Sequence, residues 1–197
     1  MIRIEIIPLI RSVLLSCTMA LLLCPSDLAQ DVVLEFDSAQ TQINFTLGDI
    51  LHTVHGTFTL KRSRLEFNPS TGQVTGLVVV DSSSGQSGNE GRDRKMHKEV
   101  LESNRFPEIT FKPVSVRGHI ALQGDSEVEV GGNFDLHGVD HDITLKAHLH
   151  IADDRLVADI HFPVLYVNWG LKNPSTFILR VSETVSIDLH ATGRLMK

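Results

Sequence analysis

The sequence predicts an all-β domain of about nine short strands, with one short helix set between its two halves. Three observations support this fold class. Apolar and polar residues alternate over most of the chain, which is typical of half-buried strands. Turn residues, such as the run NPSTG at 68–72, separate the alternating segments. Residues 92–102 depart from the alternation, because Met96, Val100 and Leu101 have the spacing of one helical face.

The N-terminal residues 1–29 have the features of a secretory signal peptide. Arg3 and Arg11 form a positively charged region before an apolar run at 12–24, which is too short and too poorly flanked to span a membrane. We expect cleavage after Ala29, which makes residues 30–197 the mature domain and leaves no integral membrane span in it. A lipoprotein signal that uses Cys24 is the alternative. The expected location is periplasmic or secreted.

Composition narrows the classes of partner. Both cysteines lie in the signal segment, so the mature domain has neither disulfides nor thiol chemistry and depends on apolar burial for its stability. The formal net charge of −6 argues against nucleic acid as a partner, and equally against an anionic membrane surface.

The strands are expected in two groups, one on each side of the helix. From Val32 to the helix, alternation predicts strands that include 43–47, 54–60 with a continuation through 65–67, and 74–80. The polar run at 81–91 is expected to be an exposed loop. After the helix, the pattern predicts strands near 109–111, 114–120, 128–136, 143–151, 156–162, 177–181 and 185–191. Short strands in this number indicate a sandwich or a barrel, and closure into a barrel removes vulnerable strand edges.

The helix is expected to pack on the strands as a plug or cap. Its apolar stripe places Val100 and Leu101 against them. Pro107 then returns the chain to a strand, because proline cannot continue a helix and biases Phe106 toward an extended conformation. The polar residues of the helix are expected to face solvent, namely Arg92, Lys95, Lys98 and Glu99.

Several segments, taken in order, resemble the YceI-like family of exported lipid-binding proteins. The quoted segments are RDRKMHKEVLESNRFPEITFKP at 92–113, FDLHGVDHDITL at 134–145 and VSETVSIDLHATG at 181–193, with FDSAQTQINFTL at 36–47 and VHGTFTLKRSRLEFNP at 54–69 before them. The resemblance covers Val32 to Gly193 and implies an extended antiparallel, eight- or nine-stranded lipocalin-like β-barrel. It also implies that the lumen holds an amphiphilic polyisoprenoid, either a polyprenyl lipid or a prenylated quinone.

Apolar side chains on the strand faces are the candidate ligand-binding residues. A barrel of about eight strands has an interior that is either filled by side chains or able to hold one ligand, and the resemblance favours the ligand. Trp169 is expected near the mouth, with its ring on the ligand and its N–H near a polar head group. The candidate lumen residues are Phe45, Phe58, Leu60, Phe67, Phe111, Phe134, Leu136, Leu145, Phe162 and Trp169.

The sequence predicts neither catalysis nor a metal site. It contains no Gly-rich phosphate loop, no His-Glu-x-x-His run and no nucleophile elbow, so no catalytic residues and no cofactor other than a lipid ligand are expected. The candidate metal ligands are His137, His141, His148 and His150, but a metal site needs three or four converging ligands. Polar-face histidines on exposed strands explain this pattern more simply.

The sequence therefore favours an exported binding protein that shields a polyisoprenoid from water. The alternative is a β-sandwich interaction module with a packed interior and no ligand. A continuous apolar cavity would distinguish the first from the second. Homodimer formation is left open.

Overall fold

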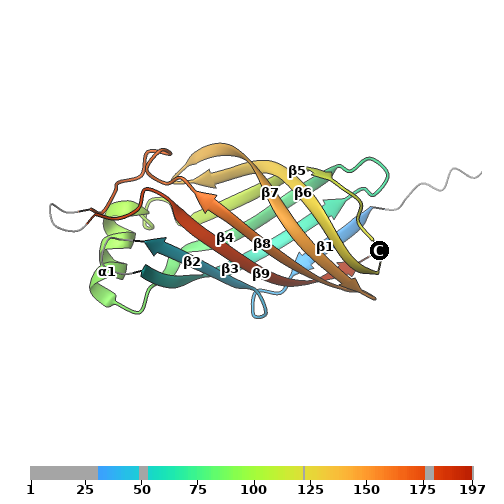
Figure 1. The fold of residues 1–197 in the computed structure, drawn as a ribbon, viewed down its shortest axis with the longest axis horizontal. Coiled ribbons are helices and arrows are strands. Elements are labelled where there is room, and N and C mark those ends of the chain that lie inside the picture. Colours follow the sequence, from blue (N-terminus) through green and yellow to red (C-terminus); the bar gives the residue numbers. More distant parts are fainter. Residues whose placement is uncertain (1–30, 49–52, 122, 176–179, 197) are drawn as a thin grey trace, which may run out of the picture.

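The described residues form an elongated barrel of antiparallel strands with a short helix at one end (Figure 1). This computed structural model describes residues 31–48, 53–121, 123–175 and 180–196. The expected signal peptide at 1–29 lies outside the described residues.

Eight strands close the barrel and a ninth extends it. The strands are β1 (Val32–Phe36), β2 (Gln42–Gly48), β3 (Thr53–Phe67), β4 (Val74–Gln86), β5 (Glu108–Arg117), β6 (Gly124–Leu136), β7 (Val139–Ala152), β8 (Arg155–Val164) and β9 (Val185–Met196). The order β2-β9-β8-β7-β6-β5-β4-β3 returns to β2, which closes the sheet. The predicted all-β barrel class is thereby confirmed, and a sandwich of two sheets is not the fold.

The extra strand β1 shares one position of the barrel with β2. Both pair with β3 and β9, with β1 at the end away from the helix. Phe36 lies opposite Gly193 of β9, and Gln42 lies opposite His190 of the same strand. The chain from Phe36 to Gln42 is longer than the chain between their partners, Gly193 and His190. The turn at 37–40 therefore loops out between β1 and β2, which form two halves of one long strand.

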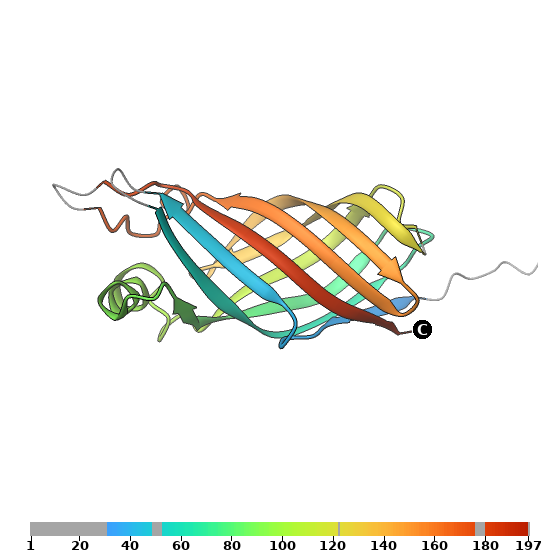
Figure 2. The same cartoon turned by 60° about the horizontal axis from the view of Figure 1, so that its bottom comes forward.

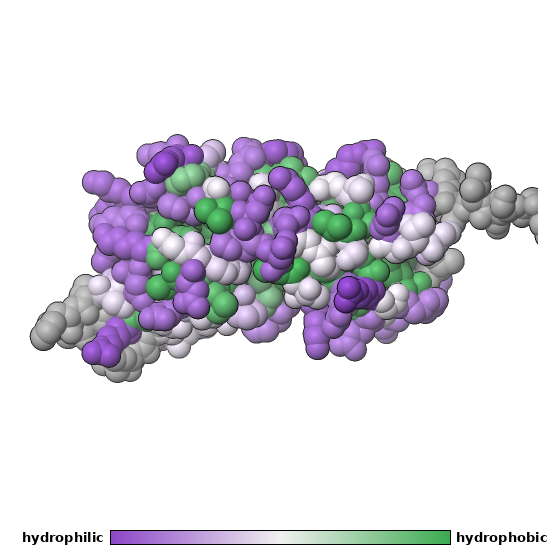
Figure 3. All heavy atoms as spheres, turned by 90° about the horizontal axis from the view of Figure 1, so that it is seen from above, coloured by the Kyte–Doolittle hydropathy of each residue, from purple (hydrophilic) through white to green (hydrophobic). Residues whose placement is uncertain are grey.

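Alternation along each strand separates the inside of the barrel from its outside. On β7, Leu145 and Ala147 line the interior and are buried, while Lys146 and His148 are exposed. Figure 2 shows the tilted strands winding around the long axis. Figure 3 shows an outer face on which hydrophilic side chains predominate between scattered apolar ones. The apolar face of the sheet is thus turned inward all round.

The helix lies at the end of the barrel opposite β1 (Figure 1). It consists of α1 (Glu90–Lys95) and a π-helical turn, η1 (Met96–Val100), that continues it directly. The element predicted at 92–102 is confirmed, although it begins and ends two residues earlier. The helix begins after Asn89, whose Oδ1 accepts a hydrogen bond from the Arg92 N–H at 3.0 Å. Within the described residues, no helix is long and apolar enough to cross a membrane.

The prediction that all polar helix residues face solvent is wrong for two of them. Lys98 is exposed, but Arg92 and Lys95 are half-buried and line the interior of the barrel. The reason is the position of the helix across the barrel end. Arg92, one turn before Met96, and Lys95, directly before it, therefore reach the lumen together with Met96 itself.

The polar run at 81–91 is also not a loop throughout, because β4 continues to Gln86. Its polar side chains have specific partners. Ser84 Oγ accepts a hydrogen bond from the Thr59 N–H at 2.8 Å, and buried Ser82 donates to Ser103 Oγ at 3.2 Å. A hydrophobic period of two cannot detect a strand whose buried positions hold serine and glycine.

The strand expected at 177–181 falls mostly on residues 176–179, which lie outside the described part of the chain. The described remainder, Arg180 and Val181, belongs to none of the named strands. The prediction for this segment therefore stays open.

Candidate functional site

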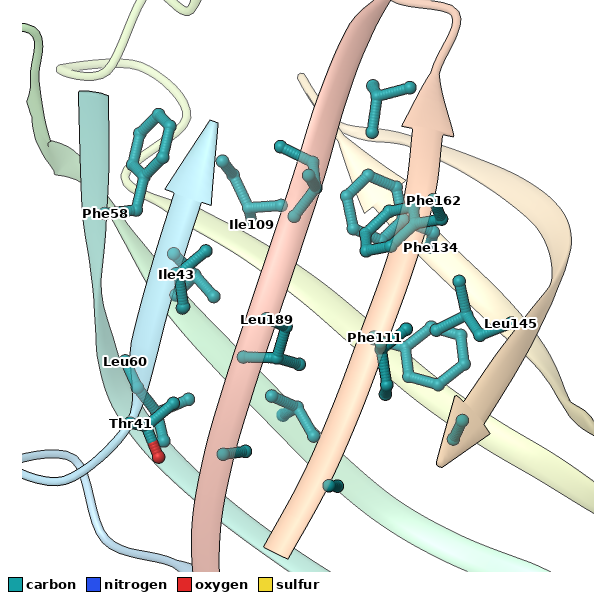
Figure 4. A pocket seen from close by; sticks show the side chains of 18 of the residues that line it. Thr41, Ile43, Phe58, Leu60, Ile109, Phe111, Phe134, Leu145, Phe162 and Leu189 are labelled. Carbon is teal, nitrogen blue, oxygen red and sulfur yellow. The ribbon is translucent and has the colours of Figure 1, made fainter. Parts of the chain in front are cut away.

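The interior of the barrel holds an apolar cavity of about 930 Å³ (Figure 4). Every one of the nine strands contributes side chains to its wall. Ligand pockets in proteins typically enclose about 300–1,000 Å³, so this cavity has the size of a binding site rather than of a packing defect. The structure therefore lacks the packed interior expected for the alternative, an interaction module without a ligand.

Phenylalanine rings form much of the cavity wall near the helix end. Phe134 and Phe162 meet edge to face with 6.0 Å between ring centroids, and Phe45 and Phe58 lie 5.5 Å apart on the opposite wall. Figure 4 shows the rings of Phe58, Phe134 and Phe162 pointing into the lumen, with Phe111 and aliphatic side chains further along it. Several of the inward phenylalanines are only partly buried, because part of each ring faces the open cavity.

Nine of the ten predicted lumen residues lie on this wall. Their contact with a ligand stays a prediction. They come from six strands, and the structure brings them around one continuous space: Phe45, Phe58, Leu60, Phe67, Phe111, Phe134, Leu136, Leu145 and Phe162.

Trp169 is the exception, since it is not among the described residues that line the cavity. Its ring stacks on His141 of β7, with centroids 4.1 Å apart and planes at 10°, and its centroid lies 5.8 Å from that of Phe134. A turn after β8, in which the Trp169 N–H donates to the Leu165 carbonyl at 3.0 Å, sets this placement. Trp169 therefore supports the wall from behind Phe134.

Small inward residues, which the sequence reasoning did not single out, keep the lumen open. Ala147, Ala158 and Ala191 all line the cavity and are nearly inaccessible. Ala158 and Ala191 are direct cross-strand partners on β8 and β9. The signal in the sequence is alanine at the inward positions of strands with alternating apolar and polar residues, where a packed barrel needs larger side chains.

The cavity carries positive charge at the helix end. Among the described lining residues, Arg92 and Lys95 carry a positive charge, and none is an aspartate or a glutamate. Arg92 donates from Nε to Ser87 Oγ at 2.7 Å and from Nη2 to the Ser87 carbonyl at 2.9 Å. Lys95 Nζ donates to the Pro174 carbonyl at 3.2 Å.

A buried polar network fastens the helix to β4. His97 Nε2 lies 2.7 Å from the Gly85 carbonyl and Nδ1 lies 2.9 Å from Ser103 Oγ, which in turn contacts Ser82. Because a carbonyl only accepts, Nε2 carries the hydrogen of its contact. These bonds fix the helix across the end of the cavity.

Tyr166 is a polar group at the cavity wall. Its side chain is buried, and its hydroxyl donates to the Ser182 carbonyl at 2.7 Å. Burial raises the pKa of the Tyr166 phenol to about 12, and the nearby Glu183 carboxylate adds to the rise. The phenol is therefore neutral at physiological pH.

The four candidate metal ligands do not converge. His137 Nε2 contacts Glu102 at 3.1 Å, His141 stacks on Trp169, and His150 contacts Asp125 at 2.7 Å on the outer face. His148 lies 3.7 Å from Glu127, also outside. Among the residues that the structure describes, no group of three or more histidine, cysteine or carboxylate side chains is placed to hold a metal ion.

Comparison with known proteins gives a family match over most of the chain. A model of the YceI-like domain matches residues 34–193. A UPF0312 protein of Vibrio parahaemolyticus is 29% identical over 124 residues, which are 60% of this chain and 62% of the relative. The match thus spans less than two thirds of that relative's length.

Solved structures share the fold at low sequence identity. BcnA of Burkholderia cenocepacia has a TM-score of 0.65 at 14% identity, covering 80% of this chain and 98% of that one. A polyisoprenoid binding domain from Saccharophagus degradans, implicated in plant cell wall breakdown, has a TM-score of 0.62 at 17% identity, covering 83% and 98%. At these identities the likeness concerns the fold alone.

Proposed function

The chain belongs to the YceI-like domain family, and on that premise we propose that it is an exported protein that binds an amphiphilic polyisoprenoid in the barrel lumen. The observation that carries the proposal is the continuous cavity of about 930 Å³, walled by apolar side chains. The proposed ligand is a polyprenyl lipid or a prenylated quinone. The structural neighbour from Saccharophagus degradans, described as a polyisoprenoid binding domain, supports this class of ligand.

Burial of a prenyl chain supplies enough free energy for binding. Each buried CH₂ contributes about 0.8 kcal/mol, so a five-carbon isoprene unit contributes a few kcal/mol. Two to four units then give roughly −8 kcal/mol, equivalent to micromolar affinity, after the losses from ordering the chain. The function proposed is binding without catalysis, since this burial alone shields the chain from water.

Lipid carry-over tests the ligand. Protein purified from the producing cell should show an added mass in native mass spectrometry, and organic extraction should release a prenyl lipid. Leu145→Trp should reduce that lipid, because Leu145 lines the cavity and a larger side chain occupies ligand volume. Lys146→Trp, its neighbour on the exposed face of β7, is the matched control and should retain the lipid. A wild type that never yields prenyl lipid would contradict the proposal.

Export is the second part of the proposal, supported by the signal-like residues 1–29. N-terminal sequencing of protein from the producing cell should begin at Gln30 or within a few residues of it. Recovery of an intact Met1 start from the cytosol would contradict export, independently of lipid binding.

A further inference from the structure

The formal charges of the cavity lining gather at one end of it. Arg92 and Lys95, both on α1, lie on a wall that is otherwise made almost entirely of apolar side chains. No carboxylate belongs to the described lining. A molecule that fills the lumen therefore meets hydrocarbon along most of its length and two cations where it reaches the helix.

These two cations bond neutral groups rather than carboxylates. Arg92 donates to the hydroxyl and carbonyl of Ser87, and Lys95 donates to the carbonyl of Pro174. Within the described part of the chain, neither makes an ion pair. By contrast, the solvent-facing Arg94 of the same helix pairs with Glu90 at 3.5 Å.

The nearby carboxylates have other partners. Asp93 accepts from the Ser87 N–H at 2.9 Å and from the Ser87 hydroxyl, and so holds in place the residue that orients Arg92. Glu99 accepts from Lys172 at 2.6 Å. The pKa of Glu99 is lowered mainly by that hydrogen bond, and Lys95 contributes less. Each acid supports the helix end without entering the cavity.

Apolar and cationic surfaces adjoin directly at this end. A methyl group added at Gly85 would lie 2.5 Å from the Phe58 ring and 2.9 Å from the Met96 methyl, which shows how closely these two side chains approach. Met96 follows Lys95 in the chain and lines the same cavity. A half-buried cation gains from an anionic partner, because the attraction between opposite charges is then added to the hydrogen bond that a neutral acceptor also offers.

We infer that the helix end of the lumen binds the anionic head group of an amphiphile, with Arg92 and Lys95 as its two cationic contacts. The inference rests on the proposed function for the apolar tail and adds the class of head group. A phosphate monoester, with a charge of about −1.5 to −2 at pH 7, matches two cations. A carboxylate uses the same donors with a smaller charge. A neutral quinone or alcohol accepts hydrogen bonds from the same two cations but gains no attraction between opposite charges.

Three ligands with one tail separate these possibilities. Lipid-stripped protein is titrated by calorimetry with farnesyl phosphate, farnesoic acid and farnesol. The wild type should bind farnesyl phosphate at least about tenfold more tightly than farnesol. Arg92→Gln and Lys95→Gln should each remove most of that preference, by weakening farnesyl phosphate binding far more than farnesol binding. Added salt should reduce the ratio of the affinity for farnesyl phosphate to that for farnesol in the wild type.

Matched controls come from the same helix. Arg94→Gln and Lys98→Gln remove equal charge from exposed positions and should preserve the preference. If Arg92→Gln and Lys95→Gln weaken the binding of farnesoic acid as they weaken that of farnesyl phosphate, the site accepts either anion. If farnesoic acid binds the wild type only as tightly as farnesol does, the site is specific for phosphate.

Two results would overturn the inference while leaving the proposed function in place. One is equal wild-type affinity for farnesyl phosphate and farnesol. The other is loss of farnesol binding in Arg92→Gln and Lys95→Gln alike, since the two side chains would then only hold the barrel end together. Failure of all three ligands to bind the wild type would overturn the proposed function as well.

Discussion

Tyr166 links the ionisation of one cavity residue to the stability of the barrel. Its pKa is about 12 in the folded protein, because burial disfavours the phenolate, against about 10 in the unfolded chain. The folded state therefore holds the proton more tightly. The corresponding stability is complete below pH 10 and is lost as the pH rises from 10 to 12.

Replacement of this phenol should change how steeply the stability falls at alkaline pH. Tyr166→Phe should lose about 1 kcal/mol near neutral pH, because the hydrogen bond to the Ser182 carbonyl disappears. Between pH 10 and 12 the variant should lose less further stability than the wild type, as measured by urea unfolding at each pH. Parallel curves for the two proteins would show that this phenol does not carry the effect.

At the same scale, sequence reasoning found apolar lining residues and missed charged ones. Phe58 and Phe134 lie at alternate positions of strands, so their inward direction follows from local periodicity. Arg92 reaches the cavity only because of where the helix lies in the tertiary structure. Trp169 lies off the described lining for a similar reason, since the turn after β8 directs its ring to His141.

The helix provides a test of which face supports the barrel. Leu101 lines the cavity and packs in the apolar cluster that includes Tyr166, but it is only partly buried. Leu101→Ala should therefore cost about 1–2 kcal/mol, below the roughly 2–5 kcal/mol typical of a fully buried leucine. Glu99→Ala should cost less than about 0.5 kcal/mol, because its partner Lys172 is exposed. Equal losses in chemical denaturation would mean that the helix is held by charge rather than by packing.

The β6–β7 hairpin depends on a two-residue turn, His137-Gly138, with positive φ at both positions. Such turns match the twist of paired strands and favour glycine at the second position. At Gly138 a Cβ would also lie 2.7 Å from the Phe106 ring. Pairing of β6 with β7 begins directly beside this turn, where Leu136 lies opposite Val139.

Gly138→Ala should accordingly destabilise the protein by about 1–3 kcal/mol, combining the left-handed backbone with the contact to Phe106. Gly91→Ala is the control, since the nearest atom to its Cβ is the Asn89 side-chain oxygen at 3.4 Å and its φ is not positive. That control should be neutral or stabilising by up to about 1 kcal/mol. Similar destabilisation of both variants would refute the role assigned to the turn.

For the whole molecule, closure of the sheet was predictable and the hollow interior was not. The number of short strands and the need to protect edges favour a barrel. Whether its interior is packed depends on residues such as Ala158 and Ala191, which meet only through the register of β8 with β9. The interruption between β1 and β2 likewise follows from pairing with β9 rather than from any local signal.

A barrel with an open lumen should be measurably stabilised by whatever fills it. A ligand that binds only the folded state adds about 2.7 kcal/mol at a free concentration of 100 times its Kd. For a domain of this size 1 kcal/mol corresponds to roughly 2–4 °C, so stripping the lipid should lower the Tm by about 5–11 °C. Farnesyl phosphate added back to the stripped wild type should restore most of that difference in calorimetric scans.

The lining and surface tryptophan variants locate the stabilisation. Leu145→Trp should show little rise in Tm with farnesyl phosphate, because the new ring occupies the volume of the tail, whereas Lys146→Trp should respond like the wild type. The stripped Leu145→Trp protein should itself unfold close to the stripped wild type, since an open lumen accepts the added volume that would cost a packed interior about 1–3 kcal/mol. A ligand-induced rise of equal size in both variants would place the bound molecule outside the barrel.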